Sequence, residues 1–324
     1  MKNTVKFAVM ADPHFEIVPN GDCILEEFLQ KAREENVDFI IHLGDFCYPT
    51  DRFECRCPVE KMPVNVKNAY NKSCPKEIST LLEKYNAFEK PAYHVFGNHE
   101  FDFASVEQII DVYNTPSNYY SFHKNGWHFI VLDGNYIKND EGNFEHYDHS
   151  HYFWKDLPWL PTDELDWLKK ELENTNEPVV MFSHQPLFNR ETGGIKNYAE
   201  FAQIVKEAKK RGKDVRVCVN GHMHVDELTE LDDVLYYGVN SASNMWVDEE
   251  YQALRFSAEI EEKYPNVRYT IPYDRALFSI VTLDEEGISV KGVEGDYVQP
   301  GPKELGYTKK ISASSSSWDR KWKK

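Results

Sequence analysis

Seven side chains of the kinds that bind metal ions occur in five short segments, each directly after an apolar run. They are two carboxylates, one amide and four imidazoles, namely Asp12, His14, Asp45, Asn98, His184, His222 and His224. Oxygen donors combined with neutral imidazoles suit Mn²⁺, Fe or Zn²⁺ better than Mg²⁺ or Ca²⁺, because imidazole nitrogen is a borderline donor. The set is too large for one ion that must also leave room for a substrate. We therefore expect two divalent transition metal ions (Mn, Fe or Zn) and the hydrolytic chemistry of such pairs.

The five segments share one design, in which an apolar strand leads into a turn. The strand expected over residues 92–96 runs into Gly97, which permits a sharp bend, and then into Asn98, His99 and Glu100. The other four strands are expected over residues 5–11, 38–43, 179–184 and 215–220. Ligands in open α/β sheets collect outside the carboxyl ends of the strands. The five segments can therefore converge on a single site although they are far apart in the chain.

The first two strands flank a helix predicted over residues 23–36, whose apolar residues share one face. A βαβ unit of this length implies a right-handed crossover and a parallel pair of strands. Asp12 and Asp45 should therefore lie side by side at one rim.

The remaining elements follow from periodicity and turn residues. Helices are predicted over residues 77–89, 105–113, 162–173 and 198–211, and a strand over 234–237. Hairpins are predicted to join 119–123 to 127–133 and 275–283 to 288–293. Two irregular stretches, 47–76 and 135–161, could frame a substrate pocket, although an inert surface excursion is the alternative for the first. Residues 240–264 are expected to form a variable excursion with a helix near 250–262.

Length and composition fit one large domain, which we place at residues 1–299, followed by a C-terminal tail, 300–324, that is partly disordered or lies on the surface. The net charge of −17 argues against nucleic acid and anionic membranes as partners. No signal-peptide pattern is visible, so we expect a cytoplasmic protein whose six cysteines are reduced. The oligomeric state is left open.

Taken in order, Asp12-x-His14, Gly44-Asp45, Gly97-Asn98-His99-Glu100, His184 and Gly221-His222-x-His224 resemble the calcineurin-like metallophosphoesterase superfamily, which includes purple acid phosphatases and class III cyclic nucleotide phosphodiesterases. The resemblance covers about residues 5–295. It implies an α/β fold, a four-layer α/β-β/α sandwich of two mixed sheets flanked by helices. It also implies a metal pair bridged by Asp45, with Asp12, His14 and His224 on one ion and Asn98, His184 and His222 on the other.

The resemblance assigns catalytic roles as well. A hydroxide bridging the two ions would be the nucleophile, with Asp45 as the shared ligand. His99 would act on the scissile phosphate or leaving group, because an imidazole can donate a proton near neutral pH. Asp45-x-x-Tyr48 is similar to the motif by which purple acid phosphatases bind iron through a tyrosinate. His14 departs from that subfamily, so we place Tyr48 outside the metal shell.

The expected function is hydrolysis of a small-molecule phosphate ester, by a phosphodiesterase or nucleotide pyrophosphatase. Phosphomonoesterase is the alternative within the class, and a catalytically silent scaffold that keeps the metal site is the alternative from another class. Protein phosphatase activity is disfavoured, because Phe46, Cys47 and Tyr48 replace the arginine-bearing motif that follows Gly-Asp in such enzymes.

The other histidines need separate readings. His146, His149 and His151 are close enough in sequence to hold a further metal, but their spacing is not helical and a polar aromatic wall is the expectation. Four more lie within or beside predicted strands outside any motif and are read as structural, namely His42, His94, His123 and His128.

Overall fold

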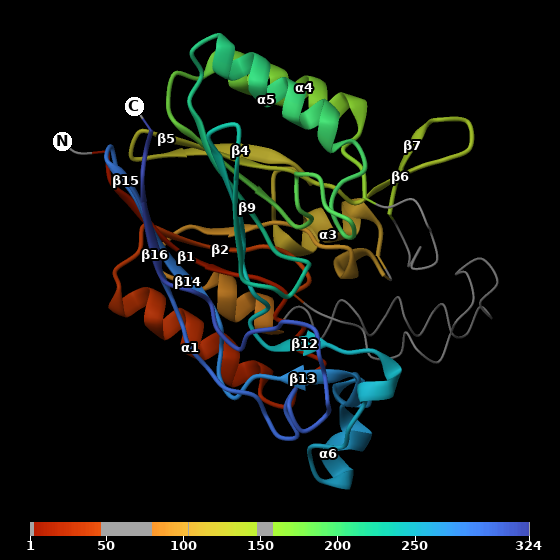
Figure 1. Cartoon of the computed structure of the whole chain (residues 1–324). Coiled ribbons are helices and arrows are strands. Elements are labelled where there is room, and N and C mark those ends of the chain that lie inside the picture. Colours follow the sequence, from red (N-terminus) through yellow and green to blue (C-terminus); the bar gives the residue numbers. More distant parts are fainter. Residues whose placement is uncertain (1–2, 47–79, 103, 148–157, 324) are drawn as a thin grey trace.

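The computed structural model describes residues 3–46, 80–102, 104–147 and 158–323. Two six-stranded mixed sheets pack face to face, with α1 (Gly21–Glu34) on one outer side and α4 (Thr162–Asn174) and α5 (Tyr198–Lys210) on the other (Figure 1). This arrangement confirms the predicted four-layer sandwich.

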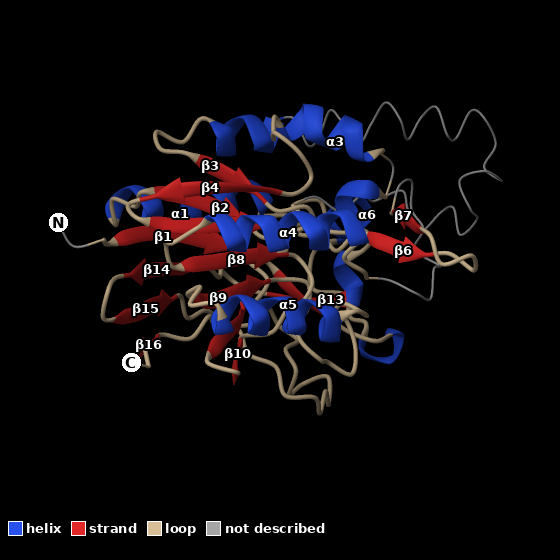
Figure 2. Ribbon diagram, turned by 90° about the horizontal axis from the view of Figure 1, so that it is seen from above, coloured by secondary structure: helices blue, strands red, loops and turns tan. Residues whose placement is uncertain are grey.

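The first sheet has the strand order β16-β15-β14-β1-β2-β3 (Figure 2). Its strands are β1 (Val5–Met10), β2 (Phe39–His42), β3 (Ala92–His94), β14 (Ser279–Leu283), β15 (Gly287–Gly292) and β16 (Trp318–Lys321). β1 pairs in parallel with β2, with Phe7 opposite Phe39, and antiparallel with β14. The predicted parallel βαβ unit is therefore confirmed, and the ends of β1 and β2 lie at the same rim.

The second sheet has the order β10-β11-β9-β8-β5-β4. Its strands are β4 (Tyr120–Lys124), β5 (Trp127–Val131), β8 (Val179–Ser183), β9 (Val215–Asn220), β10 (Glu227–Leu231) and β11 (Val234–Gly238). The segment β5-β8-β9-β11 is parallel, so the ends of β8 and β9 also face one rim. Both predicted hairpins are present, as β4–β5 and β14–β15.

Apolar side chains divide into three layers that match the sandwich. The layer between the sheets contains Phe7, Phe39, Phe129 and Phe182, and the Phe7 and Phe39 rings are stacked with centroids 4.8 Å apart. One outer layer joins α1 to the first sheet, and the other joins α4 and α5 to the second sheet. β2 and β8 are buried at every residue, which explains why all but their last residues are apolar.

Short elements complete the described chain. These are η3 (His99–Phe101), α3 (Val106–Tyr113), β6 (Tyr136–Lys138), β7 (Phe144–His146), β12 (Asn244–Trp246), η4 (Glu249–Tyr251), α6 (Ala258–Lys263), η5 (Val267–Tyr269) and β13 (Thr270–Pro272). Residues 80–86 are helical, which agrees with the described part of the helix predicted over 77–89. Ser105 caps α3 with a reciprocal capping box through Gln108.

Three of the predicted segments have a different structure. The stretch expected to be a loop from 135 contains the β6–β7 hairpin, and the helix expected over 250–262 is shorter, beginning at Ala258. The expected C-terminal tail supplies β16, which pairs antiparallel with β15. Trp318 from β16 packs against the core between the sheets, and this burial fixes the strand at the sheet edge. No described helix is long and apolar enough to cross a membrane.

Candidate metal centre

The predicted ligands meet at the rim where β1, β2, β8 and β9 end. The metal-binding side chains form two groups, and within each group the ligand atoms lie within 4.8 Å of one another. One group is made of Asp12, His14 and His224, and the other of Asp45, His184 and His222. Six of the seven predicted ligands therefore converge on two neighbouring clusters. The seventh, Asn98, belongs to the turn after β3.

The backbone at these residues is unusual. Five of the ligands have a positive φ, between 43° and 67°, namely Asp12, His14, Asp45, His222 and His224. Non-glycine residues rarely adopt this conformation, and clusters of them mark functional sites because the surrounding structure must hold them there. The strain places both carboxylates and three imidazoles at the turns directly after their strands.

Backbone hydrogen bonds join the turns after β1 and β2. The Asp12 N–H donates to the Gly44 carbonyl and the His14 N–H donates to the Asp45 carbonyl, both at 3.1 Å. Gly44 has a φ of 91° and packs directly against the backbone of Gly97. A Cβ on Gly97 would overlap the Asp45 carboxylate. The two glycines let three turns approach closely enough to share ligands.

Glu100 is a buried organiser of the site that the sequence reading did not recognise. Its carboxylate accepts hydrogen bonds from the backbone N–H groups of Asp45 at 2.9 Å, Phe46 at 2.7 Å and Gly97 at 2.7 Å. Burial, with repulsion from the Asp45 carboxylate, raises the pKa of Glu100 to about 7. The side chain fixes the turn after β2 against the turn after β3.

In the first group, two imidazoles point their ring nitrogens at each other. The Nε2 atoms of His14 and His224 are 3.1 Å apart, and His224 Nδ1 lies 2.7 Å from the Asn244 carbonyl. A carbonyl accepts only from a protonated Nδ1, so His224 Nδ1 carries a hydrogen and its Nε2 faces His14. Burial lowers the pKa of His14 well below its ordinary value, which keeps this ring neutral. Imidazole nitrogens that converge in this way are the ligands that transition metal ions use in proteins.

The second group also brings imidazole nitrogens together. His184 Nδ1 lies 2.7 Å from the Leu43 carbonyl, and its Nε2 faces His222 Nδ1 at 3.1 Å and Asp45 Oδ2 at 3.2 Å. Burial alone would lower the pKa of His184, but the Asp45 and Asp12 carboxylates outweigh it and raise that pKa to about 10. Burial and the neighbouring His184 lower the pKa of His222 to about 3. A metal ion would take the place of the proton that His184 holds between these carboxylates.

Asp45 contacts both groups. Its Oδ2 atom lies 3.2 Å from His184 Nε2 in one group and 3.8 Å from His14 Nε2 in the other. Asn98 Oδ1 is buried and has no hydrogen-bond partner within the described residues, which leaves it available as a metal ligand. The donor types, the converging ring nitrogens and this orphan oxygen fit two transition metal ions with Asp45 as a ligand of both.

His99 lies beside the clusters and is oriented by a carboxylate. Its Nδ1 is 2.7 Å from Asp102 Oδ2, and its Nε2 is 3.9 Å from Asp45 Oδ2. Asp102 is fully buried and was not identified in the sequence. The His99 backbone N–H also donates to Asp45 Oδ1 at 2.8 Å, so the backbone supports the bridging residue independently of the ring.

Histidines outside the motifs make other contacts. His42 and His94 form a buried pair at 2.8 Å, His123 pairs with the Glu177 carboxylate, and His146 Nε2 lies 2.9 Å from Asp133 Oδ2. Cys23 and Cys218 are free. Several predictions lie outside the described residues, namely those on Tyr48, His149, His151, the 47–76 insert and the four remaining cysteines.

Comparison with known proteins gives a consistent result. A family model described as calcineurin-like phosphoesterase matches residues 5–226. Two curated relatives are each named manganese-dependent ADP-ribose/CDP-alcohol diphosphatase. The one from Arabidopsis thaliana is 23% identical over 270 residues, covering 67% of this chain and 79% of the relative. The one from Oryza sativa subsp. japonica is 22% identical over 244 residues, covering 68% and 66%.

Solved structures share the fold. A dimetal phosphatase from Danio rerio superposes with a TM-score of 0.62 at 16% identity, covering 91% of this chain and 98% of that one. GAP50, described as the anchor in the inner membrane complex of Plasmodium, superposes with a TM-score of 0.52 at 15% identity, covering 96% and 89%. At these identities the likeness concerns the fold alone.

Proposed function

The chain belongs to the calcineurin-like phosphoesterase family, a family of metal-dependent phosphoric ester hydrolases, and from this premise we propose that it cleaves the pyrophosphate or phosphodiester bond of a small nucleotide-like molecule. The observation that carries the proposal is the pair of ligand clusters on either side of Asp45. The names of the two curated relatives support a nucleoside diphosphate joined to a sugar or an alcohol as the substrate.

The proposed roles of the residues rest on the two clusters and, for Asn98, on the family resemblance. Asp12, His14 and His224 would hold one ion, Asn98, His184 and His222 would hold the other, and Asp45 would serve both. Two divalent ions, when bound, supply positive charge for the phosphoryl oxygens and a nucleophile at neutral pH. The Leu43 and Asn244 carbonyls orient the ligand rings by accepting from their Nδ1–H groups.

His99 has a different role, because its Nε2 faces the site while its Nδ1 is held by Asp102. A ring held in this way can deliver a proton from Nε2 to the oxygen of the leaving group. The Asp102 carboxylate fixes the ring orientation and stabilises the protonated ring.

A substrate panel tests the proposal. Protein reconstituted with Mn²⁺ should hydrolyse ADP-ribose and a CDP-alcohol at least about tenfold more efficiently than AMP or another phosphomonoester, measured as kcat/KM. Asp45→Asn serves as the matched inactive control. Equal or better hydrolysis of the monoesters would favour the phosphomonoesterase alternative.

The scaffold alternative has a test of its own. Full occupancy by two metals with no turnover of any phosphate ester would support a silent scaffold. The intact ligand set argues against this reading, because loss of ligands is the expected signature of a site that no longer catalyses.

A further inference from the structure

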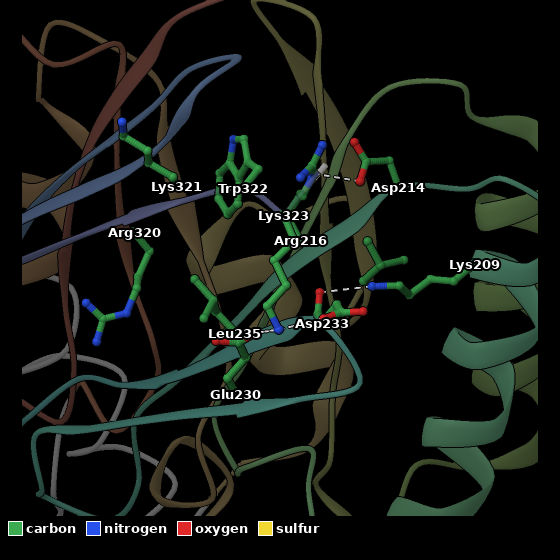
Figure 3. Close-up of a pocket in the computed structure, with 11 residues that line it drawn as sticks. Lys209, Asp214, Arg216, Glu230, Asp233, Leu235, Arg320, Lys321, Trp322 and Lys323 are labelled. Carbon is green, nitrogen blue, oxygen red and sulfur yellow. Dashed lines mark hydrogen bonds and ion pairs between the residues drawn. The ribbon is translucent and has the colours of Figure 1, made fainter.

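Polar side chains gather at both ends of the parallel strands β5, β8 and β9, but only one end carries the metal ligands. Where β9 begins, a pocket of about 270 Å³ is lined by charged side chains such as Arg216 and Asp214, which form an ion pair (Figure 3). At the opposite end, Asn135 follows β5 and Gln185 follows β8, and both side chains are buried. The polar groups at this second end can therefore act on metal binding.

Asn135 joins two turns that carry proposed metal ligands. Its Nδ2 atom donates to the Phe96 carbonyl at 2.9 Å, and its Oδ1 atom accepts from Gln185 Nε2 at 2.7 Å. Phe96 lies two residues before Asn98 in the turn after β3. Gln185 directly follows His184 in the turn after β8. One buried side chain, which is only 1% exposed, thus connects the segments that present Asn98 and His184.

The orientation of both side-chain amides follows from the chemistry of their partners. A backbone carbonyl only accepts hydrogen bonds, so the Asn135 atom that faces the Phe96 carbonyl must be the amide nitrogen. The Asn135 oxygen then faces Gln185, which must present its own amide nitrogen. The position therefore requires a side chain that donates on one side and accepts on the other. Neither an ionised carboxylate nor an apolar side chain provides both.

Asn135 is itself held in place by Asp133. Asp133 Oδ1 accepts from the backbone N–H of Asn135 at 3.0 Å and from its Nδ2 at 2.7 Å. The second oxygen of Asp133 accepts from Asn118 Nδ2 at 2.7 Å. Gly134 leaves room for Gln185, because a Cβ on Gly134 would lie 2.5 Å from Gln185 Oε1. The Asn135 amide is therefore fixed by the protein itself, independently of a bound metal.

We propose, on the basis of the ligand set given under the proposed function, that Asn135 is a positioning residue for the ion that Asn98 and His184 share. The spacing of the two turns sets the spacing of these two ligands, and outer partners that orient ligands contribute to metal affinity. Within the described residues, the side-chain hydrogen bonds of Asn135 reach only the turns after β3, β5 and β8. The ion held by the first group should therefore depend less on Asn135.

Metal uptake by the full chain tests the proposal. Protein stripped with a chelator is equilibrated with buffers of stepped free Mn²⁺ concentration, and the ions bound per chain are measured by elemental analysis. The parent should bind two ions. Asn135→Ala should bind one ion as the parent does and the other about tenfold more weakly, as for the loss of an outer partner of metal ligands. A purely structural role would lower the melting temperature without weakening one ion selectively.

Gln185→Met is a second variant that removes less. It keeps the approximate volume of the side chain and the hydrogen bond from Asn135 to Phe96, and it removes only the donor to Asn135 Oδ1. It should weaken the same ion by about threefold, as for the loss of one neutral hydrogen bond. Unchanged metal binding by Gln185→Met would overturn the proposal even if Asn135→Ala does not fold.

The matched control is Asn118→Ala. Asn118 Nδ2 contacts Asp133 Oδ2 and Tyr136 Oη, so the variant removes another amide from the same network without touching either ligand-bearing turn. It should bind both ions as the parent does, even where its melting temperature falls. Equal weakening in Asn118→Ala, or of both ions in Asn135→Ala, would overturn the proposal and indicate an effect of stability alone.

The parent separates this proposal from the ligand set on which it is based. A parent that binds only one ion would overturn the proposed ligand set and the role of Asn135 together. A parent that binds two ions, with unchanged affinities in Asn135→Ala, would overturn the role of Asn135 alone.

Discussion

Replacing His99 by Asn should separate proton donation from metal binding. The variant keeps the backbone N–H that donates to Asp45 Oδ1 at 2.8 Å, so the bridging carboxylate retains this support. It loses the ring nitrogen that lies 3.9 Å from Asp45 Oδ2. We therefore expect the His99→Asn variant to bind both metals and to lose only the proton that the ring delivers to the leaving group.

The size of the loss should depend on the leaving group. General acid catalysis contributes about 10²–10⁴-fold when the departing oxygen needs a proton and little when it does not. Hydrolysis of nucleoside or alkyl esters should fall by that factor, while nitrophenyl esters should lose less than about tenfold. Asp102→Asn keeps the ring but removes the carboxylate 2.7 Å from Nδ1, and should cost about 10–100-fold on the same poor leaving groups.

The assay measures kcat/KM on both substrate types together with metal content by elemental analysis. His123→Asn is the matched control, because His123 is exposed and pairs with Glu177 away from the site. Equal losses on good and poor leaving groups would refute proton donation and indicate that His99 stabilises transition-state charge. Loss of metal in the His99 variant would place this residue among the ligands.

Three further predictions concern metal binding and stability. Asp45→Asn should lower the occupancy of both metal sites in elemental analysis, because Asp45 Oδ2 contacts imidazoles of both clusters, whereas Asn98→Ala should lower one. Gly97→Ala should abolish metal binding and lower the melting temperature, since its Cβ would overlap the Asp45 carboxylate; unchanged metal content would contradict the close packing of these turns. Burial, with repulsion from Asp133, raises the pKa of Glu164 well above its ordinary value. The folded state thus holds the Glu164 proton more tightly than the unfolded state does, so the stability that protonated Glu164 provides is present at low pH and lost as pH rises. Glutamine cannot ionise and avoids this loss. Glu164→Gln should therefore stabilise the protein by on the order of 1 kcal/mol more at pH 8 than at pH 4, measured by thermal denaturation.

Strands that are buried on both faces can be predicted closely from the sequence. β8 is a run of five buried residues and is expected one residue longer, and the hairpin of β4 with β5 is indicated by Asn125 and Gly126, both of which have a positive φ. Strands at the edge of a sheet are harder to predict from the sequence. β10 has the sequence ELTEL and its residues are exposed or half-buried, so no apolar pattern distinguishes it from a loop. It becomes a strand because its backbone pairs with β11.

The candidate site shows the same contrast between what the sequence predicts and what tertiary contacts decide. The sequence by itself determined which ligand types are present and that each follows a strand, because donor chemistry belongs to the side chain and the strand-to-turn pattern is local. It did not determine the roles of Glu100 and Asp102. Glu100 acts by accepting from backbone groups of the turn after β2, more than fifty residues earlier in the chain. Asp102 differs from an ordinary surface carboxylate only because η3 buries it against His99.

The family resemblance implies two groups of ligands with Asp45 shared between them, but only the tertiary structure brings their side chains together. Asp12 and His224 are more than two hundred residues apart, and their side chains come within 3.6 Å because β1 and β9 end at the same rim of two facing sheets. The order and direction of strands in a sheet follow from pairing and burial across the whole chain. Distances between atoms from different strands therefore cannot be obtained from any single segment, however clear its motif.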